Sequence, residues 1–429
     1  MLADRINTLL PKMKTGGRRM AMPTDLTSIT TINHDRECVP ESVGITTENI
    51  ERIWHSVQSY YQTGLHPAIT LVIRHRGKIV LSRGIGYSHV GAVGESADDG
   101  SKLASADTPI CLFSGSKAVS AMLIHKLIEE GKVGLYDCVS DYLPEYASHG
   151  KHLTTVYDLL THRAGIRVMP IENASPSLMF DFDAVVKVLS ESPPMDTPQG
   201  GQAYHATTAG YILGAIAQKA SGESLPTLLK RILAEPLGCE HFTYGVGEER
   251  RHEVALSHST GPKKVFLATQ MLKQMLGLGE QEITAAINTP EGLSAVVPAA
   301  NIYSSAEEIC RFYQMLLDGG QWQGKTVFKP ITVANATRGG KLQFDGSMKA
   351  PIRFSAGFMR GEKLWSMFGF NTAQAFGHLG FINILCWADP ARDISVAFLN
   401  TGKSLAPEGF VGFANVTSTI SAAFPVIHK

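Results

Sequence analysis

The sequence predicts an α/β protein of the α+β type, in which helices flank one antiparallel sheet and a mostly helical lobe is inserted. Strand patterns lie near both ends of the chain, at 68–74, 78–83, 354–359, 375–379, 382–389 and 393–400. The region between them, roughly 106–289, carries mainly helical patterns. Neither group of strands is large enough to be stable alone. We therefore expect both ends of the chain to contribute to one sheet.

This division predicts the domain organisation. Residues 1–44 look like an irregular N-terminal extension. Residues 45–105 and 290–429 are expected to form the α/β lobe, and residues 106–289 the helical lobe. A chain of 429 residues is long enough for two such lobes. We expect the active site at their interface.

A helix and a hairpin are the first regular elements expected. The helix is predicted over 46–65, where Thr46 or Thr47 can cap an amphipathic pattern. The first two strand patterns follow it and are separated by His75, Arg76 and Gly77, which are typical of a tight turn.

Further helices are predicted over 114–131, 154–166, 184–192, 207–222 and 304–320. Gly131 and Gly222 mark two of the helix ends, since glycine readily adopts the left-handed conformation required there. The segment 263–278 is rich in Phe, Met and Leu at helical spacing. It is either a core helix or the wall of an acyl-binding pocket, where methionines would adapt to varied shapes.

Composition argues against several classes of function. The chain has 39 basic and 39 acidic side chains, so it lacks the basic excess of nucleic-acid binding proteins. Neither C-x-x-C nor H-E-x-x-H occurs, and we expect no metal and no cofactor. No apolar run approaches 18 residues, and the N-terminus lacks the apolar core of a signal peptide. We expect a cytoplasmic monomer or homodimer that acts on a small molecule and does not insert into membranes.

The stretch LFSGSKAVSAML, residues 112–123, contains the motif S-x-x-K, in which Ser114 and Lys117 lie one helical turn apart. Ser116 does not satisfy the motif, because a valine stands three residues after it. A serine at a helix start can offer its backbone N–H to an oxyanion, and a lysine desolvated by apolar neighbours can act as its base. The alternative is a helix-capping serine beside a solvated lysine.

A second S-x-x-K occurs at Ser148–Lys151, but it lies in a polar, glycine-containing segment without a predicted helix start, and we discount it. Tyr204 lies just before a helix and after a turn rich in Pro and Gly. Its phenol could share a proton with Lys117 and pass it to a leaving group. The alternative is an ordinary packed tyrosine.

The segment GHLGF, residues 377–381, lies on a predicted strand. Glycine in a strand permits the close approach of another backbone or of a ligand. The N–H of Phe381, next to Gly380, is therefore a candidate second oxyanion donor, and His378 is a candidate ligand for a substrate oxygen. A structural histidine at a strand end is the alternative.

In this order, Ser114-x-x-Lys117, Tyr204 and H-x-G at 378–380 resemble the serine β-lactamase and penicillin-binding-protein superfamily. The sequence is most similar to the class C β-lactamase-like esterases, or family VIII carboxylesterases, a group that includes the lovastatin acyltransferase. The resemblance extends over roughly 48–402. It implies a β-lactamase/transpeptidase-like fold and an acyl-enzyme on Ser114. It also implies that Lys117 and Tyr204 transfer protons, and that the N–H groups of Ser114 and Phe381 hold the oxyanion.

Two departures from the β-lactamase pattern indicate the substrate. The tyrosine motif reads Tyr204-His205-Ala206 where the β-lactamases have Tyr-x-Asn, and His378 stands where they usually have a carboxylate-binding lysine. A site without that amide and without a fixed cation should favour neutral esters over anionic β-lactams. We expect a serine carboxylesterase for small to medium neutral esters. The alternatives are an acyltransferase, a β-lactamase or D-aminopeptidase, and a catalytically silent binding protein.

Overall fold

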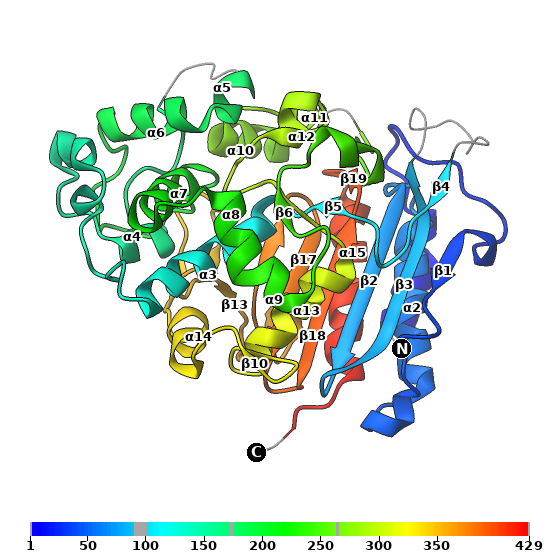
Figure 1. Cartoon of the computed structure of the whole chain (residues 1–429). Helices are drawn as coiled ribbons and strands as arrows, with labels where there is room; N and C mark the ends of the chain where they lie inside the picture. The colour runs from blue at the N-terminus through cyan, green and yellow to red at the C-terminus, as the bar shows by residue number, and fades with distance from the viewer. Residues whose placement is uncertain (1, 90–100, 171–175, 263–265, 428–429) are drawn as a thin grey trace.

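The computed structural model describes residues 2–89, 101–170, 176–262 and 266–427. At its centre is an antiparallel sheet in which strands from both chain ends lie side by side (Figure 1). In spatial order its strands are β1 (Thr30–Ile32), β3 (Lys78–His89), β2 (Ala68–His75), β18 (Ile394–Asn400), β17 (Ile384–Asp389), β16 (Phe376–Gly380) and β13 (Met359–Arg360), and β4 (Lys102–Leu103) also pairs with β3. The two ends of the chain meet where β2 pairs with β18, with Leu71 opposite Phe398. The predicted fold class is confirmed.

Helices cover both faces of this sheet. On one face, α2 (Thr47–Tyr61) packs against α15 (Pro407–Ala423), and α1 (Leu2–Leu9) contacts both. On the other face, α13 (Ala306–Leu317) contacts β2, β17 and β18. Leu71 and Ile73 of β2 therefore lie in the core beneath α2 and α15, whereas Val72 lies in the core on the opposite face. Burial on both faces explains why β2 and β18 read as continuous apolar runs.

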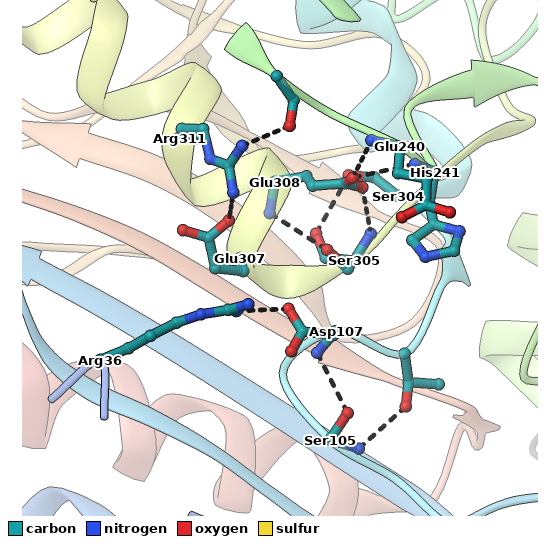
Figure 2. Close-up of polar contacts among 12 residues, drawn as sticks. Arg36, Ser105, Asp107, Glu240, His241, Ser304, Ser305, Glu307, Glu308 and Arg311 are labelled. Carbon is teal, nitrogen blue, oxygen red and sulfur yellow. Dashed lines mark hydrogen bonds and ion pairs between the residues drawn. The ribbon is translucent and has the colours of Figure 1, made fainter. Parts of the chain in front are cut away.

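Helix α13 begins with a capping box that ties it to the helical region. The N–H of Glu308 donates to Oγ of Ser305 at 3.2 Å, and the Glu308 carboxylate accepts the N–H of Ser305 at 3.3 Å. As Figure 2 shows, the same carboxylate accepts the backbone N–H groups of Glu240 and His241. A residue that caps one helix thus also anchors a loop about 70 positions away in the sequence.

The segments between the two halves of the sheet are mostly helical and lie beside it (Figure 1). The helices of this region are α3 (Ser116–Glu129), α4 (Val156–Leu160), α5 (Pro176–Phe180), α6 (Phe182–Glu191), α7 (Thr208–Ser221), α8 (Leu225–Leu229), α9 (Glu235–Leu237), α10 (Phe266–Leu276), α11 (Glu280–Ile287) and α12 (Pro290–Ser294). A further helix, α14 (Pro330–Thr337), contacts α3. Within this region α3 packs against α7, and α3 also contacts β16.

Short strands also lie outside the central sheet. They form small sheets of β5 (Ile110–Cys111), β8 (Ile302–Ser304) and β6 (Thr243–Tyr244), of β7 (His258–Ser259) with β19 (Gly402–Lys403), of β9 (Gln321–Trp322) with β10 (Lys325–Thr326), of β11 (Leu342–Phe344) with β12 (Pro351–Arg353), and of β14 (Trp365–Ser366) with β15 (Gly369–Phe370). The parallel pair β7–β19 brings the end of the helical region against the chain that leaves β18.

Two sequence-based expectations are corrected. The segment 1–44 is not wholly irregular, because it contains α1 and the edge strand β1, whose Thr30 pairs with Ile85 of β3. The segment 354–359 is not a strand: its chain reverses in a turn in which the N–H of Ser355 donates to the carbonyl of Phe358 at 2.9 Å, and Gly357 has φ of 116°. Its apolar residues are buried in a turn, and β13 begins only at its end.

Within the described residues, no helix is both long and apolar enough to cross a lipid bilayer.

Candidate active site

Ser114 lies in a 3-10 turn, residues 113–115, that leads directly into α3. The turn is fixed by backbone hydrogen bonds from Leu112 N–H to the carbonyl of Ile302 at 2.8 Å and from Gly115 N–H to the carbonyl of Leu112 at 2.9 Å. Ser116 is buried, and its Oγ accepts the N–H of Ile302 at 3.0 Å, so it attaches the turn to β8. Ser114 is the serine that faces a pocket.

Lys117 is buried one turn after Ser114, and its Nζ lies 3.0 Å from Oγ of Ser114. Nζ also donates to the backbone carbonyls of Ala206, at 2.6 Å, and Ala299, at 3.2 Å. Burial holds the pKa of Lys117 well below its ordinary value. A neutral amine has two N–H groups and one lone pair. The two carbonyls can take both N–H groups, which leaves the lone pair for the hydroxyl proton of Ser114.

Tyr204 lies beside this pair, and Nζ of Lys117 is 4.9 Å from the centre of its ring. Burial raises the pKa of the Tyr204 phenol, and the nearby Asp345 carboxylate raises it too, while the hydrogen bond to Ser114 acts in the opposite direction. The phenol is therefore protonated at neutral pH. A tyrosinate that takes a proton from Lys117 is disfavoured, and a phenol that donates one fits this environment better.

Asp345 is a site residue that the sequence analysis missed. Its buried carboxylate accepts the backbone N–H of Tyr204 at 3.0 Å and the amide of Gln202 at 3.1 Å. It also accepts the N–H groups of Ser347 and Met348, both at 2.9 Å, which orders the following turn. The Asp-Gly pair at 345–346 is a turn signal in the sequence, but only the fold brings it against Tyr204.

The end of β16 approaches the turn before Ser114. A Cβ atom on Gly380 would lie 2.5 Å from the carbonyl oxygen of Leu112, so only glycine permits this approach. The ring of Phe381 packs against the ring of Phe113 with 5.3 Å between their centres. Phe113 has a positive φ of 46°, as have Ile382, at 50°, and Asn383, at 72°, in the loop after β16. Both chain segments beside Ser114 are thus held in conformations that non-glycine residues rarely adopt.

His378 does not face the pocket at Ser114. Its side chain is buried, its Nδ1 lies 2.8 Å from the carbonyl of Leu379, and burial lowers its pKa to about 3. It lines a different, small cavity of about 30 Å³ together with Lys117, His162 and Ser120. The geometry therefore gives no support for a direct contact of His378 with substrate.

The pocket in front of Ser114 is apolar and has a volume of about 300 Å³. Its polar side chains are Ser114, Tyr204 and Asn383, and none of the described residues that line it is charged. The remaining wall is formed by Ala206, Leu272, Met275, Leu276, Met348, Met359, Leu379, Gly380, Phe381, Ile382, Leu405 and Phe410. The amide of Asn383 donates to the hydroxyl of Tyr60 and the carbonyl of Gly409, so it is already engaged.

Helix α10 forms one side of this pocket through Leu272, Met275 and Leu276. Of the two interpretations of segment 263–278, the described part supports a pocket wall. Residues 263–265 of that segment lie outside the described residues. The described part of the chain contains no cluster of three or more side chains suited to hold a metal ion.

Comparison with known proteins shows the family and the fold of the chain. Residues 56–419 match the beta-lactamase family. The chain is 26% identical over 336 residues to the esterase/beta-lactamase LipL of Mycobacterium tuberculosis, an alignment that covers 74% of this chain and 76% of that protein. A penicillin-binding protein homologue from Caulobacter crescentus has a TM-score of 0.72 at 25% identity, covering 89% of this chain and 99% of its own. A family VIII carboxylesterase has a TM-score of 0.73 at 23% identity, covering 88% and 99%.

Proposed function

Because this chain belongs to the beta-lactamase family, whose members are serine hydrolases, we propose that it is a serine carboxylesterase that acts on neutral esters with an apolar acyl group. The observation that carries the proposal is the pocket at Ser114, whose described lining is apolar and uncharged. A pocket with an apolar lining and no cation has nothing to compensate the desolvation of a substrate carboxylate. An uncharged ester does not need that compensation.

We infer the reaction from the positions of three side chains. The neutral amine of Lys117 takes the hydroxyl proton of Ser114, and Oγ attacks the ester carbonyl. The oxyanion that forms is held by the backbone N–H groups of Ser114 and Phe381. Tyr204 donates its proton to the departing alkoxide, the C–O bond breaks, and an acyl-enzyme remains on Ser114. The ammonium of Lys117 then gives its proton to the Tyr204 phenolate, which restores the neutral amine and the phenol.

Deacylation uses the same groups in reverse. A water molecule gives a proton to the neutral amine of Lys117 as its oxygen attacks the acyl carbonyl. The second tetrahedral intermediate collapses with release of the acid, and Oγ of Ser114 is reprotonated from Lys117. An alcohol in place of water would give acyl transfer from the same intermediate.

The pocket volume supports an acyl group of medium length. A cavity of about 150 Å³ holds a benzene molecule, and the pocket here is about 300 Å³. Acyl chains of about six to ten carbons therefore fit on volume alone. Met275, Met348 and Met359 supply flexible walls that can adjust to chains of different shape.

The test is a series of p-nitrophenyl esters from acetate to dodecanoate, with nitrocefin measured under the same conditions. We expect the highest kcat/KM between hexanoate and decanoate, at least about 100-fold above that for nitrocefin. Hydrolysis of nitrocefin at a rate comparable to the best ester would contradict the proposal.

A variant of one wall residue tests the pocket itself. Met275→Ala should move the optimum toward longer acyl chains, because it enlarges the pocket. Met195, which is 50% exposed and is not among the lining residues, provides the matched control as Met195→Ala. An unchanged chain-length profile for Met275→Ala would show that the acyl group lies elsewhere.

A further inference from the structure

A second lysine near the candidate active site, Lys403, is completely buried. It belongs to β19, just after the end of β18. Its Nζ donates to the backbone carbonyl of Asn400 at 3.0 Å and to the side-chain oxygen of the same residue at 3.1 Å. It also lies 5.0 Å from the centre of the Phe113 ring. Among the described residues, Lys403 forms no ion pair. A buried amine without a carboxylate partner is unfavourable for stability, which suggests that it serves another purpose.

The contact with Phe113 reaches both backbone segments that would hold the oxyanion. Phe113 directly precedes Ser114 and has a positive φ. Its ring contacts both Nζ of Lys403 and the ring of Phe381. An ammonium over an aromatic face is attracted to it, and the attraction increases when the cation is desolvated. Lys403 can therefore fix a ring that touches both segments.

The contact with Asn400 reaches the loop after β16, which continues the segment of Phe381. The side-chain amide of Asn400 donates to the backbone carbonyl of Asn383 at 2.7 Å. Asn383 has a positive φ and lines the pocket in the loop after β16. By accepting from Lys403, the side-chain oxygen of Asn400 is oriented so that its amide faces this loop.

We propose that Lys403 is a positioning residue for acyl transfer at Ser114, whose ammonium group fixes Phe113 and Asn400 and thereby aligns the two backbone segments of the oxyanion site. This inference rests on the proposed function, because it concerns the alignment of that reaction. Lys403 itself is not among the residues that line the pocket.

The surroundings of Lys403 bring the titration of its amine close to neutral pH. Burial lowers its pKa from 10.5 to about 7, while the nearby Cys111 and Glu280 raise it. His66 also faces it and is neutral, because burial lowers the pKa of that histidine to about 3. Above pH 7 the amine loses its charge and with it the attraction to the Phe113 ring. The positioning should therefore weaken as pH rises through neutrality.

The test compares Lys403→Met with Lys151→Met on p-nitrophenyl hexanoate from pH 5.5 to 9. Lys151 is the matched control, since it is also completely buried and bonded to backbone carbonyls but lies outside the pocket lining. For Lys403→Met we expect kcat at pH 6.5 to fall about tenfold, with KM within twofold and with the decline of kcat above pH 7 abolished. Lys151→Met should leave kcat and its pH profile unchanged.

If Lys403 only stabilised the fold, Lys403→Met would lower the melting temperature. An apolar side chain of similar size removes a buried charge, so the melting temperature of Lys403→Met should be equal to or above that of the wild type at pH 6. If this variant does not fold, Phe113→Leu removes the ring from the other side and should abolish the same alkaline decline. If both variants fold, the double variant should lose no more activity than the single variants.

The outcomes separate the two proposals. Wild-type kcat and pH profile in both Lys403→Met and Phe113→Leu would overturn the role of Lys403 while leaving the esterase intact. A wild-type protein that neither hydrolyses the ester series nor reacts with a fluorophosphonate probe would overturn the proposed function, and the role of Lys403 with it.

Discussion

The chain contains two S-x-x-K motifs, and their lysines have almost the same surroundings. Lys117 lies 3.0 Å from Oγ of Ser114, and Lys151 lies 3.3 Å from Oγ of Ser148. Each lysine is buried, donates to two backbone carbonyls and lies above a tyrosine ring, at 4.9 Å for Lys117 and 5.2 Å for Lys151. Burial lowers the pKa of both amines.

The difference lies in the two serines. The hydroxyl of Ser148 donates to the carbonyl of Ser190 at 2.7 Å, so its proton is committed to a structural hydrogen bond. The chain is kinked there, with Ser148 extended and His149 at a positive φ. Ser114 instead leads into a regular helix and faces the apolar pocket beside the end of β16. A buried lysine next to a serine is thus insufficient for catalysis. Ser114 differs from Ser148 because its hydroxyl proton is not committed to a backbone carbonyl, because it faces a pocket, and because a second backbone segment lies beside it.

The largest expected effect distinguishes the serines of the two motifs. Ser114→Ala should lower kcat for an ester by at least about 1,000-fold, because no acyl-enzyme can form. Ser148→Ala should retain wild-type kcat within twofold. A fluorophosphonate probe should label the wild type and Ser148→Ala but not Ser114→Ala. Labelling that disappears in Ser148→Ala and persists in Ser114→Ala would show that Ser148, and not Ser114, is the nucleophile.

The next effect concerns the lysines. Lys117→Met should lower kcat by about 100- to 10,000-fold, the range typical of a removed general base. Lys151→Met should change the stability but not kcat, because its amine contacts only structural oxygens. Both variants are compared by ester kinetics and by thermal unfolding. Equal kcat in Lys117→Met and wild type would exclude Lys117 as the base.

The tyrosines should show a smaller difference. Tyr204→Phe removes the proposed proton donor and should lower kcat about 100-fold. Tyr146, whose ring lies below Lys151, should tolerate Tyr146→Phe without loss of activity. Leaving groups of lower pKa need less protonation, so the Tyr204→Phe defect should diminish from an alkyl ester to a p-nitrophenyl ester. A defect of the same size on both esters would argue against proton donation.

The smallest expected effect is on stability as a function of pH. The folded-state pKa of Lys117 lies well below 10.5, so between these two values the unfolded state binds one more proton than the folded state. The unfolding free energy should therefore rise with pH in that window, by at most about 1.4 kcal/mol per pH unit for one group. Lys117→Met should flatten this dependence more than Lys151→Met, as measured by urea unfolding between pH 6 and 9. A slope unchanged in Lys117→Met would show that the amine is charged in the folded protein.

The pH dependence of activity follows from the same shift. Since the base must be neutral, kcat/KM should fall as pH decreases through the lowered pKa of Lys117. The raised pKa of Tyr204 predicts no alkaline loss from ionisation of the phenol below pH 10. Any decline near neutrality would then belong to Lys403, and measuring the profile in Lys403→Met assigns it.

The local features can be predicted from the sequence alone, because they depend on residues a few positions apart. The three-residue spacing selects Ser114 and excludes Ser116, and Ser116 indeed serves a structural hydrogen bond. The helix end predicted at Gly222 is correct for the same reason. The prediction of a strand over 354–359 is wrong, since a buried turn and a short strand carry similar apolar patterns.

Only the tertiary structure decided which of the two S-x-x-K motifs faces a pocket. The carbonyls of Ala206 and Ala299 that fix Lys117 have no signature in the sequence, since every residue has a carbonyl group. Asp345 lies more than 140 positions after Tyr204, whose backbone N–H it accepts. Lys403 lies about 290 positions after Phe113, whose ring it contacts. Such contacts depend on how the sheet, α3 and the helical region pack together, which no short-range pattern specifies.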